Sequence, residues 1–293
     1  MKRKGSIAVI YNPWRQEAKG LAKSIVGLCG VGGAFIVSLG DLDARFEEIR
    51  NCDVLVSVGG DGSILRIVRR TAVLGIPILG VNLGRVGFMT EIFASEVHER
   101  FHQYLDGSPG IEERTMLDVS VARTKHQQPS REEQFTAVSA LNEAVVSRGE
   151  GSRPIWVDVT VDGTFLVGYS ADAVIVATAT GSSGYSLSSG GPIIYPTSPA
   201  LLLKPVSPQL SLDSGIIIDS SSKVDLELSN TYPGLLSVDG IDAIRLDPGD
   251  HVEIKRSQLC ARFLRMGPRK NILPRLGERL GSPNALKVDP RAE

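Results

Sequence analysis

The stretch V-L-V-S-V-G-G-D-G-S, residues Val54–Ser63, decides the fold of the first part of the chain. Residues 54–58 are apolar apart from one serine and predict a short buried strand. Glycines at three of the next four positions let the backbone turn sharply, and we expect a helix over Ser63–Val73 with Ile64, Leu65 and Val68 on one face. A buried strand, a glycine turn and a helix in this order are typical of a parallel α/β layer.

The segments on either side repeat this pattern. Ile7–Tyr11, Phe35–Ser38 and Ile78–Val81 are short runs rich in valine and isoleucine, and Ala18–Leu28 has the periodicity of a crossover helix. Uninterrupted apolar strands separated by helices predict a parallel sheet that is covered on both faces. We therefore expect an N-terminal α/β domain over residues 1–110.

The pattern changes from residue 115 onward, where apolar and polar residues alternate, as in Leu117–Val121. Asp162-Gly163 is a two-residue hairpin turn between Ile155–Val161 and Thr164–Val167, and Asp239-Gly240 is a second such turn. Turns and short strands at this spacing predict an antiparallel, β-rich C-terminal domain over residues 111–264. Residues 265–293 are expected to form a basic tail, either solvated or used as an anion-binding flap.

Composition narrows the class of protein. The 293 residues have a formal net charge of −1, which gives the molecule no overall attraction to nucleic acid or anionic lipid. Cys29, Cys52 and Cys260 form no C-x-x-C pair, which excludes a disulfide framework and favours a reducing compartment. No segment approaches the roughly 20 apolar residues of a membrane span. We expect a cytoplasmic protein without a nucleic-acid or membrane partner.

The glycine turn is the first candidate site. It brings backbone amides close to an oxyanion, and the following helix directs its positive N-terminal end to the same place. Asp61 would repel a phosphate unless it takes a proton from an attacking hydroxyl or holds the magnesium ion of a nucleotide. The alternative is an ordinary strand–helix turn in which Ser63 caps the helix. Neither a Walker loop nor G-x-G-x-x-G occurs in the chain.

Two further segments predict ligand contacts. Asn82 ends the strand Ile78–Val81, so we expect it beside Asp61, because the carboxyl ends of parallel strands line the ligand crevice of α/β sheets. The run Gly181–Pro192, G-S-S-G-Y-S-L-S-S-G-G-P, provides small side chains, hydroxyls and exposed amides suited to a phosphate or pyrophosphate. A flexible linker is the alternative, but Tyr185 and Leu187 are expected to be buried.

A metalloprotease motif also occurs. His98-Glu99-Arg100-Phe101-His102 matches H-E-x-x-H, in which two histidines one helical turn apart hold zinc. Only two other histidines exist in the chain, and Val97, Phe101 and Tyr104 give this segment an ordinary amphipathic face. We interpret the match as coincidental. The chain has no G-x-S-x-G hydrolase motif.

The candidate segments occur in one order across most of the chain. They are Gly59–Ser63 (G-G-D-G-S), Asn82–Phe88 (N-L-G-R-V-G-F), Leu141–Glu143 (L-N-E), Ala171-Asp172 with Thr180–Pro192, Pro205–Pro208 (P-V-S-P) and Val238–Gly240 (V-D-G). This succession resembles the NAD kinases, which phosphorylate the 2′-hydroxyl of the adenosine ribose of NAD to form NADP. G-G-D-G alone is shared with other kinases, whereas the serine-glycine run together with Asn-Glu is specific.

The resemblance implies an active site in a crevice between the α/β and β-rich domains and an assembly into homodimers or homotetramers. It implies ATP or polyphosphate as the phosphoryl donor, with Mg²⁺ or another divalent metal, and NAD as the substrate. Asp61 would be the catalytic base on the 2′-hydroxyl. The implied NAD-binding residues are Asp61, Gly62, Asn82, Asn142, Glu143, Arg153, Asp172, Ser183, Gly184, Tyr185, Ser186, Leu187 and Ser188. The implied phosphate-binding residues are Gly59, Gly60, Gly62 and Arg66, and no metal site made by the protein alone is implied.

The chain departs from the family's pattern at Ala173, Ala179, Gly184 and Ile241, the last of which stands where a polar residue often follows the Asp-Gly turn. Ala179 and Gly184 stand where the family's T-P-T-G-S-T-A-Y has proline and alanine, and Ala173 stands where it has the glycine of A-D-G. Fewer backbone restrictions leave the loop less preorganised, so we expect weaker nucleotide binding more than altered chemistry.

Two other functions remain open at this point. One is a related kinase of the G-G-D-G type that phosphorylates another alcohol, such as a lipid. The other is a sensor that binds a nucleotide without turnover, although a carboxylate in the glycine turn brings no advantage to a protein that only binds. The sequence leaves the choice of donor, the choice between NAD and NADH, feedback regulation and the size of the oligomer undecided.

Overall fold

A computed structural model describes residues 6–30, 33–84, 87–123, 138–149, 153–209 and 211–266. The chain divides into two compact units. The first comprises Met1–Glu112 together with Arg262–Glu293, and the second comprises Glu113–Ala261. None of the described helices is long and apolar enough to cross a membrane.

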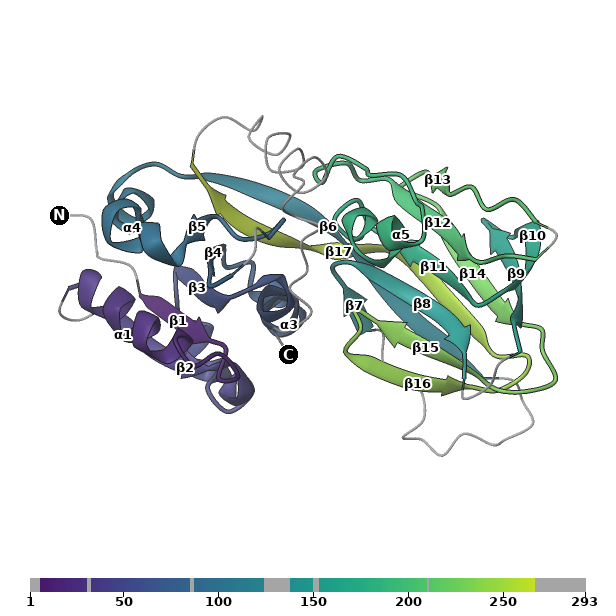
Figure 1. Ribbon diagram of the computed structural model, residues 1–293, viewed down its shortest axis with the longest axis horizontal. Coiled ribbons are helices and arrows are strands. Elements are labelled where there is room, and N and C mark those ends of the chain that lie inside the picture. Colours follow the sequence, from purple (N-terminus) through teal and green to yellow (C-terminus); the bar gives the residue numbers. More distant parts are fainter. Residues whose placement is uncertain are drawn as a thin grey trace, which may run out of the picture. The chain divides into compact units, whose positions relative to one another are not determined.

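The first unit is built on a parallel sheet (Figure 1). Its strands are β1 (Ile7–Tyr11), β2 (Ala34–Ser38), β3 (Val54–Gly59), β4 (Ile78–Asn82) and the short β5 (Ile92–Phe93). The four longer strands lie in the order β4-β3-β1-β2, all parallel, so their carboxyl ends meet at one edge. In β17 (His251–Arg265), Phe263 pairs with Ile78 on the other side of β4.

Helices cover both faces of this sheet. They are α1 (Ala18–Leu28), α2 (Phe46–Ile49), α3 (Asp61–Thr71) and α4 (Val97–Asp106), with 3-10 turns at Leu39–Asp41, Ala72–Leu74 and Ala94–Glu96. Ile25 of α1 and Phe101 of α4 belong to one buried cluster with Val9 and Val56 of the sheet. On the opposite face, Ile64 of α3 packs over Gly80, where an added Cβ would lie 2.9 Å from the isoleucine methyl.

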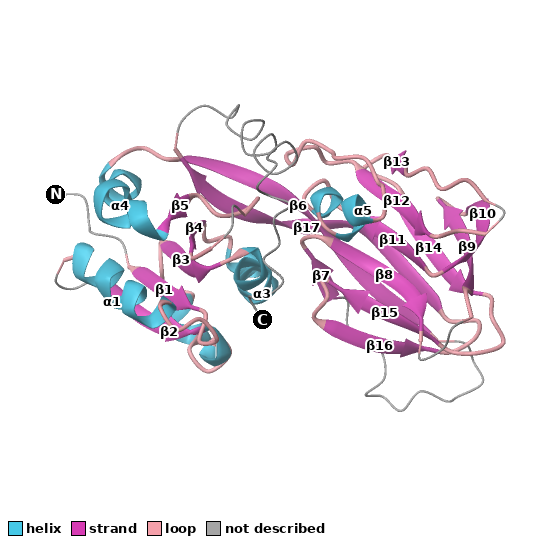
Figure 2. Cartoon of the chain, in the orientation of Figure 1, coloured by secondary structure: helices cyan, strands magenta, loops and turns pink. Residues whose placement is uncertain are grey.

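The second unit is almost entirely β-structure, as Figure 2 shows for its described residues. One antiparallel sheet has the order β13-β12-β11-β8-β15-β16. The strands that face it are β9, β10, β14 and β17, together with β6 and β7. Their bounds are β6 (Gly110–Ala122), β7 (Val138–Ala140), β8 (Glu143–Arg148), β9 (Ile155–Val161), β10 (Thr164–Ala171), β11 (Ala173–Ala177), β12 (Leu201–Val206), β13 (Ile216–Ile218), β14 (Lys223–Leu228), β15 (Gly234–Val238) and β16 (Asp242–Leu246).

A single apolar core lies between the two sheets of this unit. Val174 and Val176 of β11 point into it with Val157 of β9 and Val252 of β17. The alternate residues of β11 are buried on the outer face of their sheet, where Ala179 and Ile194 cover them. The serine-glycine segment, which contains a 3-10 turn at Gly181–Ser183 and the short helix α5 (Tyr185–Ser188), is thus attached to that face.

The predicted fold class is confirmed, because a parallel α/β unit is followed by an antiparallel β-rich unit. The two crossover helices and the four buried strands occur within two residues of their predicted bounds. The sequence predicted domain boundaries at 110/111 and 264/265. The two compact units of the structure divide inside β6, between Glu112 and Glu113, and inside β17, between Ala261 and Arg262. Apart from Arg265 and Met266, the predicted basic tail of residues 265–293 lies outside the described residues.

Candidate active site

The glycine turn leaves the start of α3 open to a ligand. Gly60 is the N-cap residue in extended backbone conformation (φ −126°, ψ −169°), and it has no side chain with which to cap the helix. The amides of Ser63 and Ile64 donate hydrogen bonds to the carbonyl of Gly60. The amides of Asp61 and Gly62 come before this first helical bond, at the N-terminal end of the helix, where backbone N–H groups have no acceptor within the helix. A Cβ added to Gly60 or Gly62 would meet no atom within 4 Å, so neither glycine is required by internal packing.

The Asp61 carboxylate has a fixed orientation. Its Oδ2 accepts a hydrogen bond from the amide of Phe88 at 2.9 Å, and its Oδ1 accepts one from the amide of Met89 at 3.1 Å. Both amides belong to the segment that follows β4, the strand next to β3. A Cβ at Gly87 would lie 2.4 Å from Oδ1, so this approach requires glycine there. The side chain is half-buried, and the carboxylate retains lone pairs for a further donor.

Asn82 lies at the same edge of the sheet as the glycine turn. It pairs with Gly59 in the β3–β4 register, and its side chain is buried. Its Oδ1 accepts a hydrogen bond from the amide of Gly84 at 3.0 Å. This hydrogen bond stabilises the turn that follows β4. The structure thus places Asp61 and Asn82 on adjacent strand ends, and the predicted contact of Asn82 with NAD stays a prediction.

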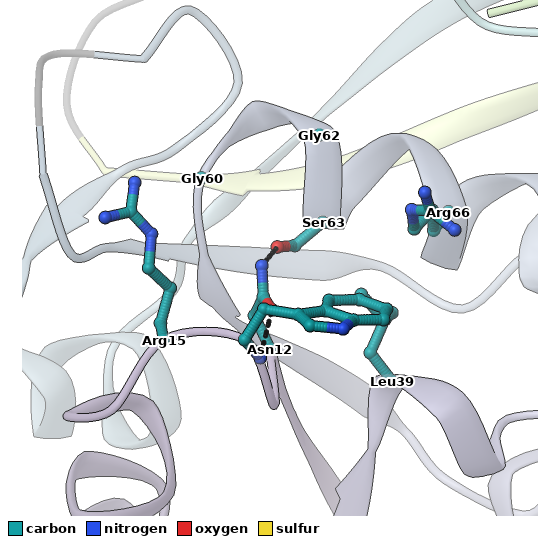
Figure 3. A pocket seen from close by; sticks show the side chains of 8 residues that line it. Asn12, Arg15, Leu39, Gly60, Gly62, Ser63 and Arg66 are labelled. Carbon is teal, nitrogen blue, oxygen red and sulfur yellow. Dashed lines mark hydrogen bonds between the residues drawn. The ribbon is translucent and has the colours of Figure 1, made fainter. Parts of the chain in front are cut away.

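A cavity of about 470 Å³ opens in front of this edge (Figure 3). It is lined by Asn12, Trp14, Arg15, Leu39, Gly60, Gly62, Ser63 and Arg66. The Nδ2 of Asn12 donates to the Oγ of Ser63 at 3.1 Å, and the two arginines lie on opposite sides of this contact in the figure. Ser63 is therefore a buried residue of the first helical turn and not the helix cap, which corrects the alternative of a serine-capped turn.

In the second unit, one carboxylate organises the Leu-Asn-Glu segment. The oxygens of Asp239 accept hydrogen bonds from the amides of Leu141, Asn142 and Glu143, at 2.8, 2.8 and 3.1 Å. Asp239 has a positive φ of 50°, a value that turns tolerate best at aspartate, asparagine or glycine. The sequence indicated this aspartate as part of a hairpin turn and of the V-D-G motif, but its function in supporting Asn142 and Glu143 was missed.

The serine-glycine segment is tied to Asn142. The Oγ1 of Thr178 donates a hydrogen bond to the carbonyl of Leu141 at 2.6 Å. The same oxygen accepts a hydrogen bond from the amide of Gly181 at 3.1 Å. A Cβ at Gly181 would lie 2.1 Å from the carbonyl oxygen of Asn142, so only glycine permits this approach. The two segments form one rigid corner, although about 40 residues separate them in the sequence.

Three polar atoms at this corner are buried and have no hydrogen-bond partner among the described residues: the Oδ1 of Asn142, the Oε2 of Glu143 and the Oγ of Ser186. Gly184 faces the first two residues, since its Cβ would lie 3.3 Å from the Glu143 Oε2 and 3.8 Å from the Asn142 Nδ2. A buried polar atom without a partner is costly, so the corner is suited to a polar ligand.

The environment of Glu143 changes its acidity. Burial raises the pKa of its carboxyl group from an ordinary 4.5 to about 8, and the negative charge of Asp239 contributes to the rise. At neutral pH, Glu143 is therefore mainly protonated in this structure and can donate a hydrogen bond as well as accept one.

The remaining predicted residues of this unit occupy two places. Ser183, Tyr185, Leu187 and Ser188 belong to the serine-glycine segment, near the corner. Tyr185 is 44% exposed and Leu187 is half-buried, so the expectation that both are buried is wrong; Ala179 and Ile194 attach the segment instead.

Asp172 and Arg153 lie apart from that corner. Asp172 precedes β11, whereas the corner follows it, which separates the two by the length of a five-residue strand, about 17 Å at 3.3 Å per residue. It faces Arg148, with 3.5 Å between Oδ1 and Nε, and Arg153 is exposed two residues before β9. Within the unit, the structure does not bring either residue beside Asn142 and Glu143.

The H-E-x-x-H segment forms part of α4. Phe101 and Tyr104 are buried, and His98 and His102 are exposed on the outer side of the helix. Among the described residues, no group of three histidine, cysteine, aspartate or glutamate side chains could hold a metal ion. The amphipathic interpretation of this segment agrees with these positions.

A glycine turn that leaves a helix N-terminus open and holds a fixed carboxylate is the arrangement expected of a nucleotide-dependent phosphotransferase. Comparison with known families makes this assignment specific. The model of the ATP-NAD kinase N-terminal domain matches residues 10–108, and that of the ATP-NAD kinase C-terminal domain matches residues 141–266. The chain belongs to the NAD kinase family.

Individual relatives agree with this assignment. The NAD kinase of Chloroflexus aggregans is 34% identical over 278 residues, which cover 94% of this chain and 98% of the relative. That of Dehalococcoides mccartyi is 33% identical over 285 residues, which cover 97% and 98%. An NAD kinase from Archaeoglobus fulgidus, solved in complex with ATP, is similar with a TM-score of 0.72 at 25% identity over 92% of this chain and 98% of its own. A yeast NADH kinase solved with NADH shares the fold, with a TM-score of 0.82 at 24% identity over 98% and 91%.

Stability should depend on pH through Glu143. Between its ordinary pKa of 4.5 and the raised value of about 8, the folded protein retains a proton that the unfolded chain has released, so stability falls as pH rises through this window. The variant Glu143→Gln lacks this titration. Chemical denaturation should show the variant gaining stability relative to the native protein as pH rises from about 4.5 to about 8.

The matched control is Glu99→Gln, a change at an exposed position of α4. It should leave the pH dependence of unfolding unchanged. Parallel stability curves for the native protein and Glu143→Gln across the window would contradict the raised pKa.

Proposed function

We propose that this chain transfers the terminal phosphoryl group of ATP to the 2′-hydroxyl of the adenosine ribose of NAD and so forms NADP. Membership in the NAD kinase family supports the class of reaction. The observation on which the mechanism rests is the Asp61 carboxylate, held by the amides of Phe88 and Met89 at the end of the glycine turn.

The glycine turn binds the donor phosphates in this mechanism. The amides at the start of α3 and the positive end of its dipole attract an anion, and Gly60 and Gly62 leave open space for one. Arg66 lines the adjoining cavity one turn further along the helix and supplies a positive charge. Phosphoryl transfer requires mainly alignment and neutralisation of charge, which these groups provide.

Asp61 accepts the proton of the attacking hydroxyl. Its two bonds to backbone amides hold the carboxylate plane in place and still leave a lone pair on each oxygen. A fixed carboxylate near the donor phosphates can orient the hydroxyl and receive its proton as the new O–P bond forms.

A divalent metal is proposed as the companion of ATP. The described residues offer only the single carboxylate of Asp61 at the glycine turn, which fits a Mg²⁺ ion held mainly by phosphate oxygens and water. Bound in this way, the metal would neutralise charge on the transferred group.

The acceptor site is assigned to the corner of the second unit. The unpartnered Asn142 Oδ1, Glu143 Oε2 and Ser186 Oγ provide polar contacts for the adenosine part of NAD. Ser183, Gly184, Tyr185, Leu187 and Ser188 would complete the site. Asp172, Arg153 and Asn82 are proposed as additional contacts to the dinucleotide.

The proposal also covers the compartment, the oligomeric state and the partners of the protein. The three free cysteines suit a reducing compartment such as the cytoplasm, and the relatives' family favours a homodimer or homotetramer. No nucleic-acid or membrane partner is proposed. A kinase for another alcohol and a catalytically inert nucleotide sensor are the functions to be tested against this one.

Incubation of the purified protein with MgATP and NAD, followed by a dehydrogenase that accepts only NADP, tests the proposal. NADP formation that depends on both substrates is the expected result. Replacing NAD with NADH and ATP with polyphosphate in parallel reactions determines the preferred acceptor and donor. Binding of ATP and NAD without any turnover would favour the sensor.

The variant Asp61→Asn should lower turnover by at least about 100-fold, a loss typical of a missing general base. The side-chain amide of asparagine cannot accept the proton. Its NH₂ group would also face one of the two backbone N–H groups that donate hydrogen bonds to Asp61 in the native protein. Initial rates measure the loss, and thermal unfolding measures any cost to the fold. Near-native turnover in a folded variant would contradict the proposed function of Asp61.

The pair Gly62→Ala and Gly59→Ala separates binding from folding. The methyl group of Gly62→Ala enters open space in the proposed phosphate site, so KM for ATP should rise by about tenfold, or about 1.4 kcal/mol, without loss of thermal stability. The methyl group of Gly59→Ala would lie 2.3 Å from the Oγ of Ser63 and should destabilise the fold. Equal effects of the two changes on stability would contradict this distinction.

A further inference from the structure

The cavity in front of the glycine turn extends beyond the groups that the transfer reaction uses. Trp14, Arg15 and Leu39 line it together with the glycine turn and Arg66. Trp14 and Arg15 follow the carboxyl end of β1, and Leu39 follows that of β2, so all three lie after strand ends of the same parallel sheet. A volume of about 470 Å³ is within the range of cavities that bind small organic ligands.

Trp14 is the most unusual residue of this cavity. Its side chain is 68% exposed, although indole rings are normally well covered in folded proteins. Its backbone is nevertheless held in place, because the amide of Trp14 donates to the Oδ1 of Asn12 at 2.9 Å while the Nδ2 of Asn12 bonds to Ser63 in α3. A large aromatic surface is thus held beside the glycine turn without being part of a core.

The charged residues that line the cavity, Arg15 and Arg66, are both positive. The guanidinium carbon of Arg66 lies 5.5 Å from the centre of the Trp14 ring, over one of its faces, and Arg15 also lines the cavity. The described lining contains no acidic residue, and no ion pair between described residues involves either arginine. Both cations therefore remain available to a ligand with negative charge.

An indole face, two cations and an anion-binding turn in one cavity match a ligand that has both a flat ring and phosphate groups. We propose that this cavity binds the nucleoside end of the phosphoryl donor, with its base stacked on the face of Trp14 that Arg66 does not cover. Arg15 and Arg66 then face the donor's phosphates. The inference rests on the proposed function and adds a specificity determinant to it, because inorganic polyphosphate has no base with which to use Trp14.

Fluorescence tests the contact directly. Trp14 and Trp156 are the two tryptophans of the sequence, so Trp156→Phe, a change in β9 of the second unit, leaves Trp14 as the sole indole. MgATP should quench the fluorescence of this variant saturably, whereas inorganic tripolyphosphate at saturation should quench it clearly less. Equal quenching by both ligands, or none by MgATP, would overturn the proposal.

Kinetics provide the second test. Trp14→Ala should raise KM for ATP at least about tenfold, since a stacked base is lost, and leave KM for NAD within about twofold. Trp14→Phe, which retains an aromatic face, should recover most of the ATP affinity. An unchanged KM for ATP, or an equal rise for NAD and ATP, would overturn the assignment.

The two tests also separate this inference from the proposed function. If the native protein forms no NADP, the proposed function fails, and the fluorescence titration still shows whether the cavity binds a nucleotide through Trp14. If NADP forms and Trp14→Ala behaves like the native protein, only the nucleoside site is refuted.

Discussion

The hydrogen bonds from the amides of Phe88 and Met89 to the carboxylate of Asp61 are the interaction on which the catalytic account depends. They join the start of α3, which follows β3, to the segment between β4 and β5. They also require glycine at position 87, where any side chain would collide with the carboxylate. Because the main chain itself holds Asp61, the orientation of this carboxylate does not depend on flexible side chains and is set before any ligand arrives.

The second unit uses the same physical device for another purpose. Asp239 also accepts hydrogen bonds from backbone amides, in this case three successive ones, and so holds Asn142 and Glu143 in place. Burial of the site and, to a smaller degree, the negative charge of Asp239 raise the pKa of Glu143 to about 8. One aspartate is thus held by backbone amides of the main chain, while the other holds the main chain of Leu141, Asn142 and Glu143.

Much of the fold could be predicted because its signals are local. The valine-rich strands, the helix Ala18–Leu28 and the glycine turn each follow from a few neighbouring residues. Contacts between distant segments could not be predicted in this way. Asp239 reaches residues almost one hundred positions earlier, and the Gly181 backbone lies against that of Asn142. No pattern of spacing indicates such pairs.

The positions of side chains in the candidate site show the same limit of local sequence patterns. Tyr185 was expected to be buried because it is aromatic, but the covering of β11 is completed by Ala179 and Ile194. The resemblance implies Asp172 and the serine-glycine segment in one dinucleotide site, and the structure shows that the whole strand β11 lies between them. Trp14 had no motif to indicate it, and only the three-dimensional cavity shows its position next to Arg66.

The most direct test of the central claim is phosphorus NMR of a reaction containing the protein, MgATP and NAD. The expected result is ADP together with one new phosphomonoester signal, whose coupling places it on the 2′ oxygen of the adenosine ribose. Release of inorganic phosphate without a phosphorylated dinucleotide, or a phosphoryl group on another hydroxyl, would contradict it.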